Sequence, residues 1–258
     1  MSENRWPALV QTASWTLVVL SSLLVNRAHT AERELVVAVQ RFFQLGYNSI
    51  RTVTDDATRR GQRVYDMWAE YGASYRVVDR LTQSLCRKAV QELDLDTGET
   101  VVDLGCGPGG SFSLLAAAVE PAGDVLGVDY SSTMVRSAGN EASDIPSASV
   151  LQGDAANLPL CADSVDAVFA SLALSSMPDL RTVLDKIGRI VRSGGQLVVV
   201  DGQVPEGRVG DAVQRIYHRL VNFQNPDVLA SLRERFRSIT VVDTFDAGLG
   251  FIARVEIS

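Results

Sequence analysis

The stretch TVVDLGCGPGG, from Thr100 to Gly110, constrains the fold of this chain more than any other. It begins with a short apolar run that is typical of a buried strand, continues with an acid, Asp103, and then contains four glycines. Glycine is needed where the backbone takes a positive φ or where a ligand must approach the main chain closely. The apolar run from Phe112 to Val119 is expected to form a helix. The stretch therefore predicts a strand, a tight ligand-binding loop and a helix.

Two classes of ligand fit such a loop. Gly105, Gly107 and Gly110 satisfy the G-x-G-x-x-G spacing of dinucleotide-binding proteins. Asp129 lies about 20 residues further on, where those proteins bind a ribose. Asp103 favours a cationic ligand instead, because a carboxylate at a strand end repels a pyrophosphate and accepts hydrogen bonds from an ammonium group. A dinucleotide and a cationic ligand are the two alternatives.

The composition narrows the class of protein. With 258 residues, of which 46% are hydrophobic, the chain can form one α/β domain with an extension. Acidic residues outnumber basic ones by 31 to 24, and the net charge of −7 argues against nucleic acid as a partner. Cys86, Cys106 and Cys161 have no metal-binding spacing, so we expect no metal site and free thiols in the reducing cytoplasm.

Residues 1–62 are expected to form an N-terminal helical extension. No charged residue falls between Arg5 and Arg27, and the segment TLVVLSSLLV within this window is strongly apolar. Its dense apolar core is about 10 residues long, shorter than the ~20 that a bilayer span requires. Three alternatives are open: a soluble helix packed on the domain, a helix in peripheral contact with a membrane, and a true anchor or signal.

Further strands and helices are predicted after the glycine loop. In an open parallel sheet, ligands bind at the carboxyl edge, where an ionised Asp129 can accept hydrogen bonds from both hydroxyls of a ribose. Ser131 is expected to cap the next helix, and the pair Asn225-Pro226 is expected to begin a later one. The predicted strands are Val125 to Asp129, Ser149 to Gln152, Val165 to Ala170, Gln196 to Asp201, and a hairpin of Ser238 to Phe245 with Gly250 to Ile257.

These motifs resemble the class I S-adenosylmethionine-dependent methyltransferases, whose first motif is commonly written V-L-D-x-G-x-G-x-G. The R-S-G-G stretch at 192–195 is similar to the family's (R/K)-P-G-G turn, and Val64 to Tyr71 fits its Y-D-x-x-A-x-x-Y segment. The family's G-D-A motif would supply Asp154 to the adenine amine and the Ala155 amide to the ring; a helix cap is the alternative for Asp154. The resemblance covers about Val64 to Ser258 and includes the quinone-biosynthesis and phospholipid-headgroup methyltransferases.

The resemblance implies a fold, a cofactor and a set of site residues. The fold would be a doubly wound, seven-stranded, mostly parallel sheet of the Rossmann-like methyltransferase type. It would occupy residues 63–258, with a substrate-specificity insert at about 203–236, and the cofactor would be S-adenosylmethionine. The expected cofactor-binding residues are Asp103, Gly105, Cys106, Gly107, Asp129, Tyr130, Met134, Asp154, Ala155, Ser171 and Tyr65. Aromatic packing between helices is the alternative for Tyr65, and packing in the core is the alternative for Met134.

The catalytic group is not evident from the sequence. The segment SLALSSMPD, where many relatives carry a polar group facing the substrate, has no histidine, and His218 is a candidate proton acceptor with helix packing as its alternative. The lack of an evident base favours nitrogen over carbon as the methylated atom. We expect a small-molecule or lipid-like methyl acceptor. The alternatives are a dinucleotide-dependent oxidoreductase of the NAD type and a non-catalytic cofactor-binding protein; the sequence does not indicate the oligomeric state.

Overall fold

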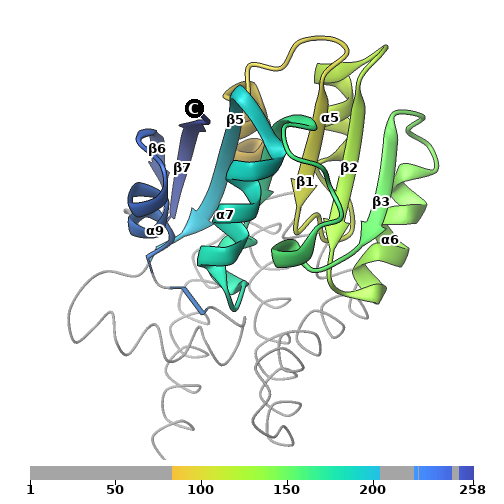
Figure 1. Cartoon of the computed structure of the whole chain (residues 1–258). Coiled ribbons are helices and arrows are strands. Elements are labelled where there is room, and N and C mark those ends of the chain that lie inside the picture. The colour runs from red at the N-terminus through yellow and green to blue at the C-terminus, as the bar shows by residue number, and fades with distance from the viewer. Residues whose placement is uncertain (1–82, 204–223, 226, 246–249) are drawn as a thin grey trace, which may run out of the picture. The chain divides into compact units, whose positions relative to one another are not determined.

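Seven strands form one mixed sheet in the order β3-β2-β1-β4-β5-β7-β6 (Figure 1). The computed structural model describes residues 83–203, 224–225, 227–245 and 250–258, which all belong to one unit, Thr54–Ser258. The pairs from β3 to β5 are parallel, and β7 runs antiparallel to both β5 and β6. The strands are β1 (Thr100–Leu104), β2 (Asp124–Asp129), β3 (Ala148–Gln152), β4 (Val165–Ser171), β5 (Val191–Gly202), β6 (Ser238–Phe245) and β7 (Gly250–Glu256).

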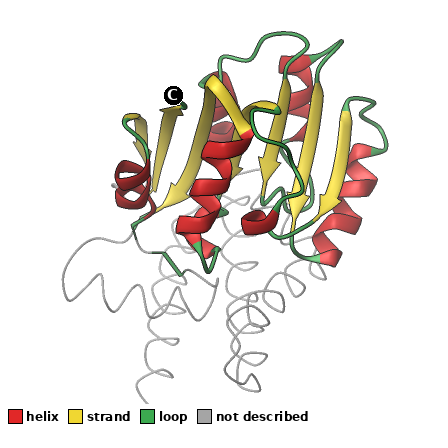
Figure 2. Ribbon diagram, in the orientation of Figure 1, coloured by secondary structure: helices red, strands yellow, loops and turns green. Residues whose placement is uncertain are grey.

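Helices cover both faces of this sheet (Figure 2). One apolar cluster packs the strands against α5, α6 and the helical residues 83–91, and a second packs them against α7 and α9. This is the doubly wound, seven-stranded, mostly parallel architecture that the sequence predicts. The helices are α5 (Phe112–Val119), α6 (Ser132–Ala142), α7 (Leu180–Ile190) and α9 (Val228–Arg235), with short 3-10 turns η1 (Ala155–Asn157) and η2 (Leu174–Ser176).

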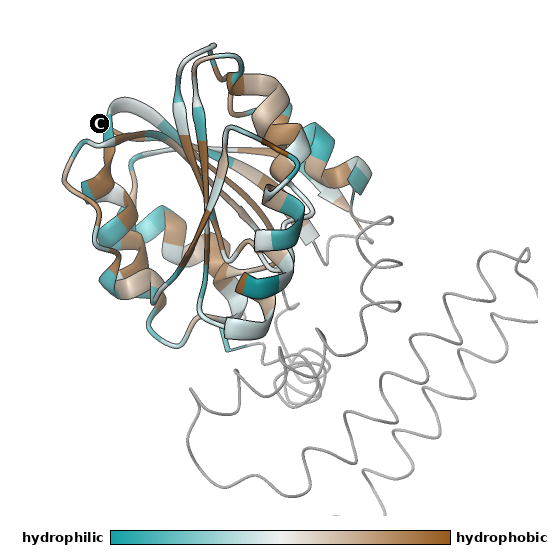
Figure 3. Cartoon of the chain, turned by 90° about the vertical axis from the view of Figure 1, so that its right-hand side faces the viewer, coloured by the Kyte–Doolittle hydropathy of each residue, from teal (hydrophilic) through white to brown (hydrophobic). Residues whose placement is uncertain are grey.

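The central strands are apolar on both faces because both faces are covered. Val198, Val199 and Val200 of β5 are all at most 1% exposed, as expected for an inner strand of a sheet that is covered on both faces. Hydrophobic residues concentrate along the strands between the helix layers (Figure 3). Gly127 in β2 allows this packing, since a Cβ there would lie 2.3 Å from Cζ of Phe112. Phe112 is fully buried and anchors α5 to the sheet.

Most predicted elements are confirmed, and two details are wrong. Ser131 caps α6 as predicted, accepting a hydrogen bond from the amide of Met134 at 3.3 Å. The R-S-G-G stretch belongs to β5 rather than to a turn before it, because the register shifts between Val165 and Ala167 and the strand continues through a bulged segment. The cap of α9 is Asp227, whose carboxylate accepts from the amide of Ala230, so Asn225 does not begin this helix.

The predicted N-terminal extension, residues 1–62, lies outside the described residues, as does most of the predicted insert at 203–236. The domain boundary between residues 62 and 63 therefore stays a prediction. Among the described residues, no helix is both long enough and apolar enough to cross a membrane.

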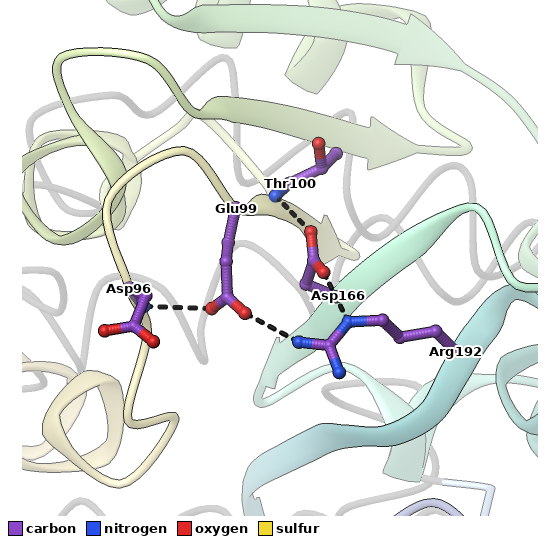
Figure 4. A network of polar contacts seen from close by, with 5 residues as sticks. All are labelled: Asp96, Glu99, Thr100, Asp166 and Arg192. Atoms are coloured by element: carbon purple, nitrogen blue, oxygen red, sulfur yellow. Dashed lines mark hydrogen bonds and ion pairs between the residues drawn. The ribbon is translucent and has the colours of Figure 1, made fainter.

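A polar network joins the starts of β1, β4 and β5 at the amino edge of the sheet (Figure 4). Arg192 donates from Nε to Asp166 at 2.5 Å and from Nη2 to Glu99 at 2.7 Å. Asp166 also accepts from the amide of Thr100 at 2.7 Å, and Glu99 accepts from the amide of Asp96. Partial burial alone would raise the pKa of Asp166, but the hydrogen bonds from Arg192 and Thr100 outweigh it and lower that pKa. One guanidinium thus ties three strands together.

Replacing this guanidinium with a point charge should lower stability without affecting the opposite edge of the sheet. Arg192→Lys keeps the charge but cannot donate to Asp166 and Glu99 at once, so we expect a loss of about 1 kcal/mol in the free energy of unfolding. Urea titration measures this. Arg181→Lys, on an exposed position of α7, is the matched control and should change stability by less than about 0.5 kcal/mol. Equal effects of the two variants would contradict the role given to the network.

Candidate functional site

The glycine loop after β1 is fixed to the end of β2 by main-chain hydrogen bonds. The amides of Gly105 and Cys106 both donate to the carbonyl of Val128, at 2.8 and 3.0 Å. Gly105 and Gly107 have φ values of 73° and 54°, the left-handed region in which side chains are disfavoured. The glycines are therefore required by the backbone, as the sequence predicts.

Asp129, at the end of β2, is brought directly to this loop. Its Oδ2 accepts a hydrogen bond from the amide of Gly107 at 3.0 Å, and its Oδ1 accepts from the amide of Ser131 at 2.8 Å. Burial raises the pKa of Asp129, while these amides oppose the rise. Each carboxylate oxygen retains a further lone pair, so the side chain can still accept from two ligand hydroxyls.

Asp103, at the end of β1, is a buried acid with an unsatisfied oxygen. The residue is 1% exposed, and no described residue donates a hydrogen bond to its Oδ2. Burial, and secondarily the negative charge of Asp129, raise the pKa of Asp103 to about 8. An unpaired buried carboxyl beside a second acid is costly for a folded chain, and a bound cation would relieve that cost. The arrangement therefore fits a ligand with a positively charged group.

Cys106 lies within this loop but is not a reactive thiol. Its Sγ is buried and donates to the carbonyl of Gly107 at 3.6 Å. Burial and the charges of Asp103 and Asp129 raise the pKa of the thiol, so it stays neutral. Cys106 belongs to the apolar cluster that includes Phe112, and its predicted contact with the cofactor stays a prediction.

The residues expected to surround an adenine lie beyond β2 and β3. Met134 is buried in α6 and Tyr130 is 48% exposed. The carboxylate of Asp154 caps η1, accepting from the amide of Ala156 at 2.9 Å and from Nδ2 of Asn157 at 3.0 Å. Asp154 thus forms the helix cap that the sequence gave as its alternative role. Each of its carboxylate oxygens still has a free lone pair that could accept from a ligand. The adenine contacts of Met134, Asp154 and Ala155 stay predictions.

Ser171 ends β4 beside the loop, with its Oγ 3.5 Å from Sγ of Cys86. Three residues near it were missed by sequence reasoning: Leu172, Asp201 and Asn225. Leu172 has a φ of 52° and is 46% exposed. Asp201 is buried at the end of β5, and the only signal in the sequence was its place at a strand end. Tyr65 and His218 lie outside the described residues.

Comparisons with known proteins agree with this geometry. A family model described as a methyltransferase domain matches residues 102–199, which include the glycine loop, Asp129 and Asp154. The demethylmenaquinone methyltransferase of Desulfitobacterium hafniense is 30% identical over 169 residues, which are 62% of this chain and 67% of that protein. The chain belongs to the class I S-adenosylmethionine-dependent methyltransferases. S-adenosylmethionine is accordingly its cofactor.

Two further known proteins are similar to this methyltransferase. The 2-phytyl-1,4-naphtoquinone methyltransferase of Synechococcus elongatus is 34% identical over 134 residues, which are 51% of this chain and 58% of that protein. The methyltransferase solved in complex with the Haloferax volcanii Trm112 activator has a TM-score of 0.61 and 21% identity, over 80% of this chain and 99% of that one. At that identity the likeness shows the fold alone. The chain spans between about half and two thirds of the two quinone-type relatives.

The site of this methyltransferase fits its cofactor. S-adenosylmethionine carries an ammonium group, a ribose and an adenine, and the buried, unpaired Oδ2 of Asp103 suits the ammonium. Asp129, with spare lone pairs at the neighbouring strand end, suits the ribose hydroxyls. The dinucleotide-dependent oxidoreductase is not favoured by the comparisons.

Removal of the Asp129 charge should weaken cofactor binding. Asp129→Asn loses charge-assisted hydrogen bonds worth about 1.5–3 kcal/mol, so we expect the Kd for S-adenosylmethionine to rise roughly 10- to 100-fold by calorimetric titration. Asp124→Asn, at the exposed opposite end of the same strand, should leave the Kd unchanged. A Kd within about twofold of wild type for Asp129→Asn would contradict the assignment.

Cofactor binding should also release a proton from Asp103. In the folded, cofactor-free chain this carboxyl keeps its proton up to pH about 8, whereas in the unfolded chain it ionises near pH 4. Its contribution to stability therefore falls as the pH rises between those values, and a bound ammonium reverses this by favouring the carboxylate.

Between pH 6 and 8 we expect affinity to rise with pH, with about one proton released per cofactor bound near pH 7. Titrations in buffers of different ionisation enthalpy measure this number. Asp103→Asn should abolish the release and raise the stability of the cofactor-free chain at pH 8. Asp201→Asn, which removes another buried acid, should keep the release. Proton release that persists in Asp103→Asn would contradict the assignment.

Proposed function

We propose that this methyltransferase transfers a methyl group to a small, lipid-like acceptor with a quinone-type ring. Relatives named as demethylmenaquinone and 2-phytyl-1,4-naphtoquinone methyltransferases support this class of acceptor. The observation in the structure that supports the proposal is the exposure of two apolar side chains, Tyr130 and Leu172, at the edge of the sheet where we expect the cofactor; we call this pair the apolar rim.

Tyr130 and Leu172 are both large, exposed and placed at the carboxyl edge of the sheet. Tyr130 follows β2 and Leu172 follows β4, and β1 with its glycine loop lies between these two strands. The two residues are 48% and 46% exposed, whereas most large apolar residues of the described chain are buried. Exposed apolar groups beside a binding site indicate a contact surface for an apolar ligand.

The backbone of Leu172 supports a functional role. A left-handed conformation costs a non-glycine residue about 1–2 kcal/mol. The amide of Leu172 donates to the carbonyl of Val200 at 2.7 Å, and this bond helps hold the residue in place. Strained backbone conformations cluster at functional sites, where the geometry of the site and not the stability of the fold determines the conformation.

The chain contributes mainly binding and alignment to the reaction. S-adenosylmethionine supplies a methyl group on a sulfonium that is already a good leaving group. Asp103 and Asp129 would hold the ammonium and ribose ends of this cofactor, and the rim of Tyr130 and Leu172 would exclude water from an apolar acceptor. Alignment of this kind, together with desolvation of the acceptor, can supply most of the barrier lowering that an in-line displacement needs.

No described residue is a base for the proton that the acceptor loses. The described residues contain no histidine. Burial raises the pKa of Asp201 to about 6, but its oxygens accept from the amides of Ser175 and Gly202 and the residue is 1% exposed. Asp201 therefore cannot reach an acceptor. The proton passes to water or to a group outside the described residues, and His218 stays a candidate.

The proposal is tested by supplying two lipid acceptors to the full chain. Chemically reduced demethylmenaquinone in detergent micelles and phosphatidylethanolamine in vesicles are incubated with methyl-deuterated S-adenosylmethionine, and the products are analysed by mass spectrometry. We expect the label in the quinol. With subsaturating cofactor, Asp129→Asn should reduce the rate at least about tenfold and Asp124→Asn should not.

Label in phosphatidylethanolamine alone would overturn the quinone-type ring in favour of a headgroup amine, which is the nitrogen acceptor that the lack of a base favours. Cofactor binding with no label in either lipid would overturn the proposed acceptor and support the non-catalytic alternative.

A further inference from the structure

The η2 turn, which follows β4, packs directly against the cofactor loop. A Cβ on Gly105 would lie 2.6 Å from Cβ of Ala173 and 3.6 Å from Cε of Met177. Ala173 precedes η2 and Met177 follows it, so both ends of this turn lie beside the side-chain position of the same glycine. The position of Gly105, and of the loop it begins, therefore depends on the shape of η2.

Asn225 holds η2 in that shape, although it is distant in sequence. Its Nδ2 donates to the carbonyl of Met177 at 2.6 Å and to that of Leu174 at 3.1 Å, with the carbonyl of Ser175 at 3.5 Å. The three carbonyls follow one another along the turn, with only that of Ser176 left out. A single side-chain amide group therefore binds the length of the turn. Asn225 thus holds the carbonyl of Met177, whose Cε lies where a side chain on Gly105 would meet it.

The main chain reinforces the same contact. The amides of Gln224 and Asn225 both donate to the carbonyl of Ser175, at 2.7 and 2.8 Å. On the other side of the turn, the amide of Ser175 donates to the buried carboxylate of Asp201 at 2.9 Å. The η2 turn is therefore held between the end of β5 and the residues that lead into α9, and Ser175 is 5% exposed.

Asn225 offers donors where the turn offers only carbonyl acceptors. A side chain that could not donate would take this bond from the carbonyl of Met177, whereas the carbonyls of Leu174 and Ser175 would keep their main-chain donors. The Met177 end of the turn would then relax away from Gly105. Asp227 provides a comparison two residues further on: it caps α9 and donates nothing to η2.

We propose that Asn225 is a positioning residue of the cofactor site: its side-chain amide holds η2 so that Ala173 and Met177 press on Gly105, and this contact sets the loop that binds the cofactor. The proposal rests on S-adenosylmethionine being the cofactor and not on the identity of the acceptor. A purely structural role for Asn225 would affect stability alone.

Three variants separate these two roles by calorimetric titration of S-adenosylmethionine and by thermal unfolding. Asn225→Ala removes the donor and is expected to raise the Kd about tenfold. Asn225→Asp has the same shape but sets acceptors against carbonyls, so it should raise the Kd at least as much. Asp227→Ala removes the α9 cap; it should lower the melting temperature and leave the Kd within about twofold of wild type.

A Kd for Asn225→Ala within twofold of wild type, at a melting temperature lowered as in Asp227→Ala, would overturn the proposal. An equal rise of the Kd in Asp227→Ala would also overturn it, because the effect would then follow from lost stability. This test measures cofactor binding and not methyl transfer. Its result therefore stands even if the acceptor proposed above is not methylated.

Hydrogen exchange on the wild-type chain keeps the proposal testable should the variants fail to fold. The amides of Gln224 and Asn225 bond to Ser175 and not to the glycine loop. If η2 couples them to that loop, saturating S-adenosylmethionine should slow their exchange by at least about fivefold. Unchanged exchange at these two amides, with slower exchange at Gly107, would contradict the coupling.

Discussion

The proposed cofactor site is organised around a buried carboxyl group, one oxygen of which receives no hydrogen bond from the described residues. Asp103 ends the strand at the centre of the parallel sheet, its Oδ2 has no hydrogen bond from any described residue, and Asp129 adds a second acid beside it. Such a pair is unfavourable in the cofactor-free chain. The sheet is held at its other edge by the Arg192 network. We propose that the cofactor supplies the missing positive charge to Asp103 and the hydroxyl donors to Asp129.

The two edges of the sheet have different roles: the amino edge contributes to stability, and the carboxyl edge carries the proposed site. At the amino edge, Arg192 donates to two carboxylates and ties three strands together, so both of these acids have a partner within the chain (Figure 4). At the carboxyl edge, the strand ends present acids, a strained Leu172 and exposed Tyr130. A parallel sheet produces this division by itself, since all its carboxyl ends meet at one edge.

The sequence predicted the elements that local chemistry determines. The helix Phe112–Val119, the Ser131 cap and the acids that end β1 and β2 follow from apolar periodicity, turn chemistry and strand ends. The contacts of Asn225 could not be predicted, because its bonds to η2 span about 50 residues and exist only in three dimensions. Because Asn225 precedes a proline, the sequence predicted that it begins a helix. The conformation of Leu172 is likewise set by tertiary contacts rather than by its own preference.

A crystal structure of the full chain with S-adenosylhomocysteine would test the central claim most directly. This account predicts the ligand's amino group within hydrogen-bonding distance of Oδ2 of Asp103, at about 3 Å, and its ribose hydroxyls on Asp129. Density that places the amino group away from Asp103, with Oδ2 still unpaired, would contradict it.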